Sequence, residues 1–472
     1  MKKFFTSILT MVIASSLFAQ TNPAITSWLL NTTGIQGSHY VSGNSTAVND
    51  NVDANVQLIQ YSADWAYINA TGIPAYTTGP FLDNNPSVAT NQDAIFQFTL
   101  NPSQNIGTPT STRGGNIGNF INGVALFDWR DGVAWNSNTN AFCGGPGNAT
   151  CPGGPMATQD WNRDAVPAEM QGFDCSKAHP AGGNYHHHQN PSAFNLDLVE
   201  VSNVCDLYVS DGLYAMSSTE HSPLIGFAYD GFPIYGAFAY ANTDGTGAIT
   251  RMKSGYSLRN MTTRTNGPIV DFVYTITSGP NTGNQETLNL GYFKEDYEYI
   301  ASMDPDVLDE HNGRFCITPE YPNGIYCYFA TVDADWNSAY PYVVGPTYYG
   351  NVTSGSVTTI NETVTEYVPA EDTTVIIDTA TTNILVLEES LEINVFPNPI
   401  AEVVAIQLPS LAKESYTVDL LDYLGRKINT ATIKQGSTIT HIDTRTLYSG
   451  SYIITVSKGN KLVSTKNIVI KK

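Results

Sequence analysis

The sequence predicts a mainly β protein, in which a large β-rich domain with long loops precedes a small C-terminal antiparallel β-sandwich. Three observations support this fold class. Residues 20–351 are rich in Gly, Asn, Tyr and Pro, and short runs of strand-forming residues alternate there with turn signals. Helical periodicity is scarce in that region. From residue 391 onward, apolar residues alternate and turn signals recur at the spacing of a small sandwich.

Four stretches of the large domain carry the clearest strand signal, and one carries a helix signal. The strand stretches are AIFQFTL (94–100), GVALFDW (123–129), DFVYTIT (271–277) and GIYCYFATV (324–332). The segment VPAEMQGF (166–173) offers one short helix. Nothing marks a break inside residues 20–351, so we expect one large domain or two closely packed halves.

The N-terminal residues predict export. Residues 1–19 have a basic start, an apolar run and small residues at the end, which is typical of a secretory signal. No other apolar run approaches the length of a membrane span, so we expect no such span.

Residues 352–390 are Thr-rich and acidic and contain few residues that could form a core. They therefore predict an extended linker.

Charge excludes one class of partner. The chain has a formal net charge of −21 at pH 7. Ten Lys/Arg and six Asp/Glu give residues 391–472 a charge of +4, which leaves −25 on residues 1–390. A surface this negative repels nucleic acid and favours cations or neutral ligands.

Six cysteines in an exported chain favour disulfides over free thiols. Cys143 and Cys151 are close enough to close a small loop, and Cys316 and Cys327 flank a turn. Cys175 and Cys205 would then pair with each other. Six cysteines permit fifteen pairings, so the sequence leaves the connectivity open.

The stretch GGNYHHHQNP contains three of the chain's eight histidines in succession. If residues 184–188 are extended, His186 and His188 lie on one face and His187 on the other. Two imidazoles on one face are a typical pair of metal ligands, and a tight site needs a third or fourth donor. The alternative is a solvated turn, or histidines packed against tyrosines such as Tyr185 with their nitrogens satisfied.

Other residues can complete such a site. His179 lies upstream across a Pro-Ala-Gly-Gly turn and can fold back, and His221 is the second candidate ligand. His311 lies further on, and Asp230 and Glu310 can supply oxygen or orient an imidazole. For Asp230, the competing interpretation is an Asp-Gly hairpin turn. Zinc or copper fits imidazole ligands best.

Two further features have alternative interpretations. The segment MDPDVLDEHNG gathers acidic residues that could hold calcium, but it lacks the spacing of an EF-hand, and a solvated turn fits better. Trp129, Trp135 and Trp161 fall in predicted loops. Exposed rings stack on sugars, whereas buried rings belong to a core.

The histidine region resembles the YHYH family over about residues 95–350. The likeness rests on several ordered blocks: Asn122-Gly123-Val124, His179-Pro180, Tyr185–His188, His221-Ser222-Pro223, Asp230–Gly236, LDEHNGRFCITPEYPNGIYCYF and YPYVVGPTYYG. The second Tyr of the signature is His187 here. The resemblance implies an exported or surface protein and is compatible with metal binding, but it implies no particular reaction.

The C-terminal segment resembles a type A sorting domain of the type IX secretion system of Bacteroidetes. Phe396-Pro397-Asn398-Pro399, Asp422, Leu424-Gly425-Arg426, Leu447, Gly450 and Tyr452 carry the likeness over residues 391–472. It implies that this machinery is a partner and that the protein is secreted or reaches the outer cell surface.

Two functions are therefore compatible with the sequence. One is a secreted protein that binds zinc or copper through a histidine cluster. The other is a non-catalytic extracellular adhesion or carbohydrate-binding module, with a small molecule or glycan as its partner. The sequence does not decide whether the protein is an enzyme.

Overall fold

The computed structural model describes residues 22–471 except 45, 84–86, 146, 155–157, 192–217, 278–281, 336, 370–392, 397–399, 401, 409–410, 423–426, 449 and 460. The predicted signal peptide, most of the predicted linker and Cys205 lie outside these described residues. The chain divides into two compact units, Met1–Val368 and Pro369–Lys472. Within the described part, none of the helices has the length and apolar character needed to span a bilayer.

The largest sheet of the first unit has eight strands and carries the histidine stretch. Most neighbouring strands are antiparallel, but β12 runs parallel to β7 and β14 runs parallel to β22. In spatial order the strands are β11 (Ala178–Ala181), β12 (Asn184–His187), β7 (Ala125–Phe127), β6 (Asn116–Phe120), β13 (Leu224–Ala228), β14 (Pro233–Tyr235), β22 (Ile325–Phe329) and β21 (Gly313–Cys316).

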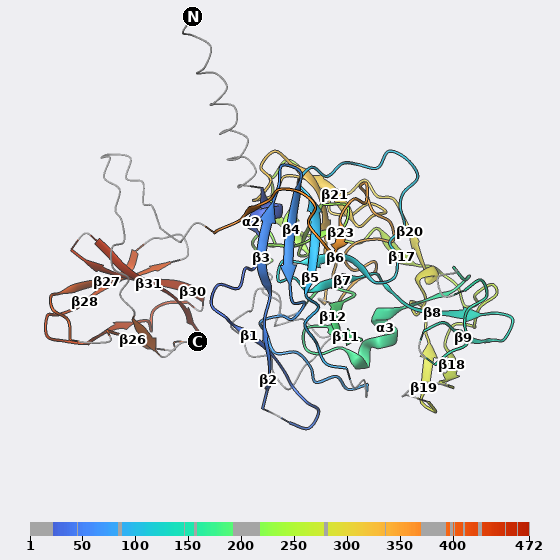
Figure 1. The fold of residues 1–472 in the computed structure, drawn as a ribbon, viewed down its shortest axis with the longest axis horizontal. Coiled ribbons are helices and arrows are strands. Elements are labelled where there is room, and N and C mark those ends of the chain that lie inside the picture. Colours follow the sequence, from blue (N-terminus) through green and yellow to red (C-terminus); the bar gives the residue numbers. More distant parts are fainter. Residues whose placement is uncertain are drawn as a thin grey trace, which may run out of the picture. The chain divides into compact units, whose positions relative to one another are not determined.

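A second, five-stranded antiparallel sheet lies in the same unit, and Figure 1 shows its strands β3, β4 and β5 side by side. Its order is β23 (Gly355–Val357), β5 (Ala94–Thr99), β4 (Trp65–Ala70), β3 (Val56–Tyr61) and β24 (Thr365–Glu366). Strands β23 and β24 come from the start of the segment that the sequence predicts as a linker. This part of the segment therefore extends the sheet at both edges.

Aromatic side chains join the two sheets. Phe98 of β5 and Phe227 of β13 have ring centroids 6.0 Å apart, and Trp28 contacts both rings at 5.1 and 5.5 Å. All three residues belong to one buried cluster that includes residues of both sheets. Burying one such side chain contributes about 1.5–3 kcal/mol. The two sheets therefore pack as a sandwich around a shared core.

Smaller elements surround this sandwich. The strand pairs are β1 (Gln36–His39) with β2 (Val48–Asp53), β15 (Phe238–Tyr240) with β16 (Ile249–Arg251), β17 (Tyr256–Leu258) with β20 (Tyr297–Tyr299), and β18 (Phe272–Thr275) with β19 (Gln285–Leu288). A three-stranded sheet has the order β10 (Asn162–Asp164), β8 (Arg130–Asn136), β9 (Ala141–Cys143). In the described part of the chain, the helices are α2 (Pro23–Thr26), α3 (Ala165–Glu169) and the 3-10 turns η1 (Met170–Gly172) and η2 (Lys294–Asp296).

The short helix predicted from VPAEMQGF is confirmed as α3 followed by η1. Asp164 caps its N-terminus, because a side-chain oxygen accepts the Val166 N–H at 3.0 Å. Pro167 is tolerated because it stands in the first turn, where its missing N–H has no intrahelical partner. The helix ends at Glu169, whose position is important for the site below.

The second unit is a small antiparallel sandwich, as predicted. One sheet has the order β25 (Asn394–Phe396), β26 (Val403–Gln407), β29 (Ile439–Asp443); the other has β28 (Lys427–Ile433), β27 (Tyr416–Asp422), β30 (Gly450–Lys458), β31 (Lys461–Ile470). Val404 and Ile406 from the first sheet share one buried cluster with Leu420 and Ile454 from the second. The alternation of apolar residues along these strands therefore forms the core of this unit.

The structure confirms one of the predicted disulfides and contradicts another. Cys143 and Cys151 are bonded. Cys175 is also in a disulfide, whose partner lies outside the described residues. The expectation of a Cys316–Cys327 bridge is wrong, because both are buried free thiols.

The strand register places the two free thiols diagonally. Cys316 faces Ile325 across the β21–β22 ladder, and Cys327 faces Arg314. The cysteines are therefore diagonal neighbours, and their thiols are in hydrogen-bonding contact without a covalent bond.

We expect alkylation of the denatured, unreduced protein to label Cys316 and Cys327 and to leave Cys143 and Cys151 unlabelled. Peptide mass spectrometry measures the labelling. Full labelling of all four after reduction is the control for access. Absence of label from the peptides of Cys316 and Cys327 before reduction would contradict the free thiols.

Candidate metal centre

A two-residue turn brings His179 back to the histidine triplet. Gly182 and Gly183 connect β11 to β12, and both have positive φ angles, 58° and 91°. Two-residue hairpin loops of this type require positive φ at both positions, and glycine adopts such angles without strain. The turn sets the register so that His179 pairs directly with His186. The predicted return of His179 across the glycines is thus present.

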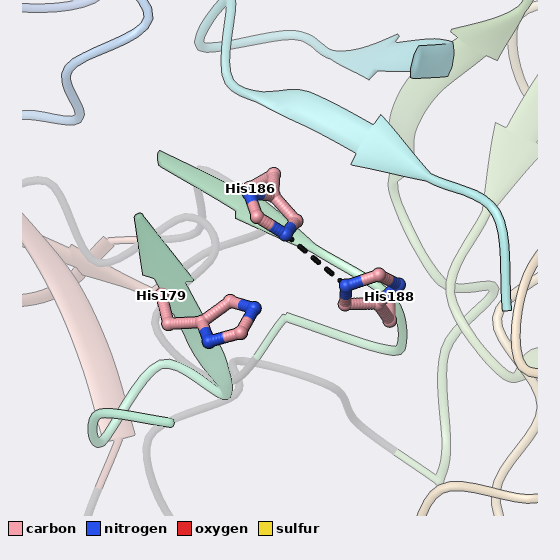
Figure 2. A group of neighbouring side chains, drawn as sticks. All are labelled: His179, His186 and His188. Carbon is pink, nitrogen blue, oxygen red and sulfur yellow. Dashed lines mark hydrogen bonds between the residues drawn. The ribbon is translucent and has the colours of Figure 1, made fainter. Parts of the chain in front are cut away.

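Three imidazoles converge on one face of this hairpin. Figure 2 shows the ring of His179 on β11 turned towards those of His186 and His188, which follow one another along β12 and its end. The Nε2 atoms of His186 and His188 are 3.1 Å apart. One ligand atom from each of the three residues lies within 4.8 Å of the others. Among the described residues, this is the one group of three or more His, Cys, Asp or Glu side chains with such spacing.

Backbone carbonyls determine which nitrogens carry hydrogen. Nδ1 of His186 contacts the Asn184 carbonyl oxygen at 2.9 Å, and Nδ1 of His188 contacts the Asp128 carbonyl oxygen at 2.5 Å. A carbonyl oxygen only accepts, so each Nδ1 donates and carries the hydrogen. In the neutral rings, each Nε2 is then unprotonated, and the lone pairs of the two Nε2 atoms face each other. This arrangement is repulsive unless a cation or a proton lies between them.

Protonation is a poor way to relieve that repulsion. Burial, together with the neighbouring imidazoles His188 and His179, holds the pKa of His186 well below its usual value. Burial also lowers the pKa of His188, although Glu169 acts in the opposite direction. The rings therefore remain neutral with free lone pairs, which is the form that binds a metal ion.

Aromatic side chains hold the imidazoles in place. Phe127 stacks on His186 with ring centroids 3.7 Å apart, and its edge meets His188 at 5.8 Å. Phe173 packs against His179 at 4.9 Å. The three histidines are buried, with exposed fractions of 7% or less. Fixed rings lose little conformational entropy when they bind a ligand, so the group is preorganised.

Glu169 is a candidate fourth donor that the sequence reasoning missed, and it adjoins two of the three imidazoles. A carboxylate oxygen of Glu169 lies 3.3 Å from Nε2 of His179 and 3.4 Å from Nε2 of His188. In a tetrahedral zinc site with bonds of about 2.0–2.1 Å, neighbouring donors stand about 3.3–3.4 Å apart. The donor types and the Glu169 separations fit a transition metal ion, and the three imidazole ligand atoms lie within the wider limit of 4.8 Å of one another. The signal available in the sequence was the single acidic residue of the predicted helix, shortly before His179.

The middle residue of the triplet faces the other way, as strand alternation predicts. His187 Nε2 lies 3.1 Å from the hydroxyl of Tyr76. Tyr185 lies on the same side of the strand and donates its hydroxyl hydrogen to Asp174 at 2.8 Å. Both side chains belong to the packed, polar layer behind the site and do not contribute to the convergent group.

His221 is not brought to this group, although the sequence predicts it as a ligand. Its Nδ1 contacts the Ser222 carbonyl oxygen at 2.8 Å, and its ring packs against Tyr235 and Tyr240. The reason is sheet order, because β13 follows His221 and pairs with β6 and β14 rather than with β12.

The remaining oxygen and nitrogen candidates also lie elsewhere. Asp230 accepts hydrogen bonds from the Tyr328 hydroxyl at 2.5 Å and the Gly350 N–H at 2.8 Å, and it contacts no imidazole. The turn interpretation of Asp230-Gly231 therefore fits better. Nδ1 of His311 lies 2.7 Å from the Thr347 hydroxyl, and the Glu310 side chain is 54% exposed.

The calcium and carbohydrate features receive no support from the geometry. In the acidic segment, Asp306 pairs with Lys253, and Asp309 accepts the hydroxyl hydrogen of Tyr326. Trp129, Trp135 and Trp161 are all buried. Their rings therefore belong to the core and offer no exposed platform for a sugar.

Asp230 gives the protein a measurable pH dependence. Burial raises the pKa of this carboxyl from 3.8 to about 6, against the hydrogen bond from Tyr328. As the pH rises, the Asp230 carboxyl therefore loses its proton in the unfolded chain before it does so in the folded protein. The resulting stability is present below pH 3.8 and is lost as the pH rises through about 6, and it amounts to about 3 kcal/mol.

We expect the free energy of unfolding of the unaltered protein, minus that of Asp230→Asn, to fall by about 3 kcal/mol between about pH 3 and 7. Urea unfolding at several pH values measures both. Taking the difference cancels the titration of the other buried groups. A difference that does not change with pH would contradict the raised pKa.

Comparisons with known proteins support the assignment of the two units. The family model described as "YHYH protein" matches residues 95–341, and the model described as "Secretion system C-terminal sorting domain" matches residues 394–471. No curated protein is similar enough to count as a match.

Among solved structures, an immunoglobulin-like protein from Pseudomonas aeruginosa is similar at 12% identity, over 18% of this chain and 94% of its own. Its TM-score of 0.13 is too low to support a statement about fold or function. The family model covers more than half of the chain, and the matched residues include β11, β12, α3 and His188, which follows β12. The chain belongs to the YHYH protein family and ends in a secretion system C-terminal sorting domain, which indicates a Bacteroidetes origin and a secreted, cell-surface protein.

Proposed function

We propose that this protein binds one transition metal ion, zinc or copper, through His179, His186 and His188 after export by the type IX secretion system. A signal peptide at residues 1–19 would direct the first step of export, and the sorting domain would engage the secretion machinery.

One observation carries the proposal: two buried Nε2 atoms, both without hydrogen in the neutral rings, face each other 3.1 Å apart. A buried polar group without a partner costs about 1–3 kcal/mol. A cation between the two nitrogens would bind both lone pairs and remove this cost. Imidazole donors favour zinc or copper over magnesium or calcium, which prefer oxygen.

Elemental analysis tests the proposal. The full chain, produced without a polyhistidine tag and dialysed against a weak chelator, should retain about one equivalent of zinc or copper. Protein stripped of metal should take up one equivalent again, measured by titration calorimetry. Absence of stoichiometric uptake by folded protein would overturn the proposal.

The alternative of a glycan-binding or adhesion module has no comparable support. The tryptophans that motivated it are buried.

A further inference from the structure

A cavity of about 880 Å³ adjoins the candidate metal centre. Its wall includes Arg163, Glu169, Tyr274, Glu286, Tyr292 and Tyr342. His179, His186 and His188 do not line it. Of the four donor side chains, Glu169 alone faces both the imidazoles and this cavity.

Solvent exposure also distinguishes Glu169 from the histidines. The side chain of Glu169 is 25% exposed, whereas those of His179 and His188 are 8% and 3% exposed. Glu169 is also the last residue of the short helix α3, and the 3-10 turn η1 follows it directly. The three histidines are packed against aromatic rings, as described above. Among the four donors, the carboxylate is therefore the one with space to move.

A second charged group of the cavity wall has free hydrogen-bond donors. Nε of Arg163 pairs with Asp131 at 2.5 Å, and its guanidinium lies 5.3 Å from the centroid of Phe142. Within the described residues, its two terminal nitrogens donate no hydrogen bond. A guanidinium presents donors in a planar fork that matches a carboxylate.

We infer that Glu169 is an exchangeable fourth ligand and that a carboxylate-bearing small molecule reaches the metal from this cavity by taking its place. This inference rests on the proposed metal site. An incoming carboxylate would replace Glu169 as the oxygen donor beside the imidazoles, and Arg163 would pair with its charge. The tyrosines of the wall provide a surface for the rest of the molecule.

The consequence for chemistry is a metal centre with one exchangeable position. Structural zinc sites keep four fixed protein ligands, whereas sites that act on a ligand keep one position free or exchangeable. A metal bound in this way can act as a Lewis acid towards an oxygen donor.

Azide binding to the copper-loaded full chain tests the inference. Azide gives a charge-transfer absorption when it coordinates copper(II), so its binding is measured without any enzymatic assay. Glu169→Gln removes the charged donor and nearly keeps the shape of the side chain. Glu286→Gln is the matched control, because Glu286 lies in the same wall but is held by the Tyr292 hydroxyl.

We expect Glu169→Gln to retain copper and to bind azide about tenfold or more tightly than the unaltered protein, with a changed electron paramagnetic resonance spectrum. Glu286→Gln should behave as the unaltered protein. Acetate should compete with azide, and Arg163→Lys should weaken acetate at least several-fold while it leaves azide affinity unchanged.

The outcomes separate the two proposals. If the folded, unaltered protein takes up no copper, the metal site itself is refuted and this inference fails with it. If copper binds but azide affinity and spectrum are equal in Glu169→Gln and the unaltered protein, the metal site stands and the exchangeable ligand is refuted. If Arg163→Lys leaves acetate unaffected, the carboxylate specificity is refuted.

Discussion

Replacing His188 with alanine is expected to lower the affinity of the protein for zinc or copper by about a hundredfold or more. His188 donates its Nδ1 hydrogen to the backbone carbonyl oxygen of Asp128. Its Nε2 stands 3.1 Å from that of His186 and 3.4 Å from a Glu169 oxygen. It therefore lies close to two other donors, one more than either of the other two histidines. Apparent binding energies of four-ligand zinc sites, about 10–16 kcal/mol, correspond to about 3 kcal/mol per ligand.

Competition with a chromophoric chelator measures this loss of affinity. His221→Ala is the matched control, because His221 is also partly buried and was predicted from the sequence as a ligand, but it packs against Tyr235 and Tyr240 instead. It should retain the full affinity. Circular dichroism checks that both variants fold. Equal affinities in the two variants would refute the assignment of ligands.

Replacing Arg264 with methionine is expected to lower the free energy of unfolding by about 3–5 kcal/mol. Arg264 and Asp296 form a two-pronged pair with N–O distances of 2.7 and 2.8 Å, and both side chains are fully buried. The guanidinium also donates to the carbonyl oxygens of Leu288 and Asn289. The substitution leaves the carboxylate of Asp296 buried without its partner, which is the main cost.

This pair holds the polypeptide that walls the cavity beside Glu169. Asp296 also accepts the backbone N–H groups of Gly291 and Phe293 at 2.9 and 3.1 Å. The neighbouring Tyr292 and Asn289 line the cavity. Loss of the pair should therefore loosen this wall while the hairpin of His179 and His186 stays intact.

Denaturant unfolding measures the effect of Arg264→Met. Arg259→Met is the matched control, because Arg259 pairs with Glu298 at 3.2 Å on the surface, where the two side chains are 46% and 44% exposed. An exposed pair contributes about 0–1 kcal/mol. Equal losses in the two variants would contradict the special role of burial.

Local rules predicted the strand face of the histidine triplet. Side chains alternate along any extended strand, so His186 and His188 share a face and His187 does not. The return of His179 was also predictable, because Gly182-Gly183 allows a two-residue turn and the register then follows from counting. Both features depend on residues within ten positions of each other, and no knowledge of the rest of the fold is needed.

Local rules could not predict the contacts that His221, Asp230 and Glu169 make in the folded protein. His221 precedes β13, which lies three strands away from β12 in the sheet, and no local pattern specifies that order. Asp230 meets Tyr328 and Gly350, which are 98 and 120 residues away in sequence. Glu169 reaches the imidazoles only because its helix packs beside the β11–β12 hairpin.

The pairing of cysteines shows the same limit. Cys143 and Cys151 are eight residues apart and bond as predicted. Cys316 and Cys327 have similar spacing, but the register of β21 and β22 places them diagonally. Spacing alone does not distinguish opposite from diagonal positions, because this depends on the length and conformation of the turn.

The sequence by itself determined the two-unit β architecture, the family, the export tail and the shared face of His186 and His188. These features depend on composition, ordered motifs and the two-residue period of a strand, which are properties of the chain as written. Only the tertiary structure decided that Glu169 approaches the histidines, that His221 does not, and that a cavity opens beside the carboxylate. Side chains from distant segments converge according to the order of the strands and the packing of the elements. The periodicity of a single segment does not specify either of these.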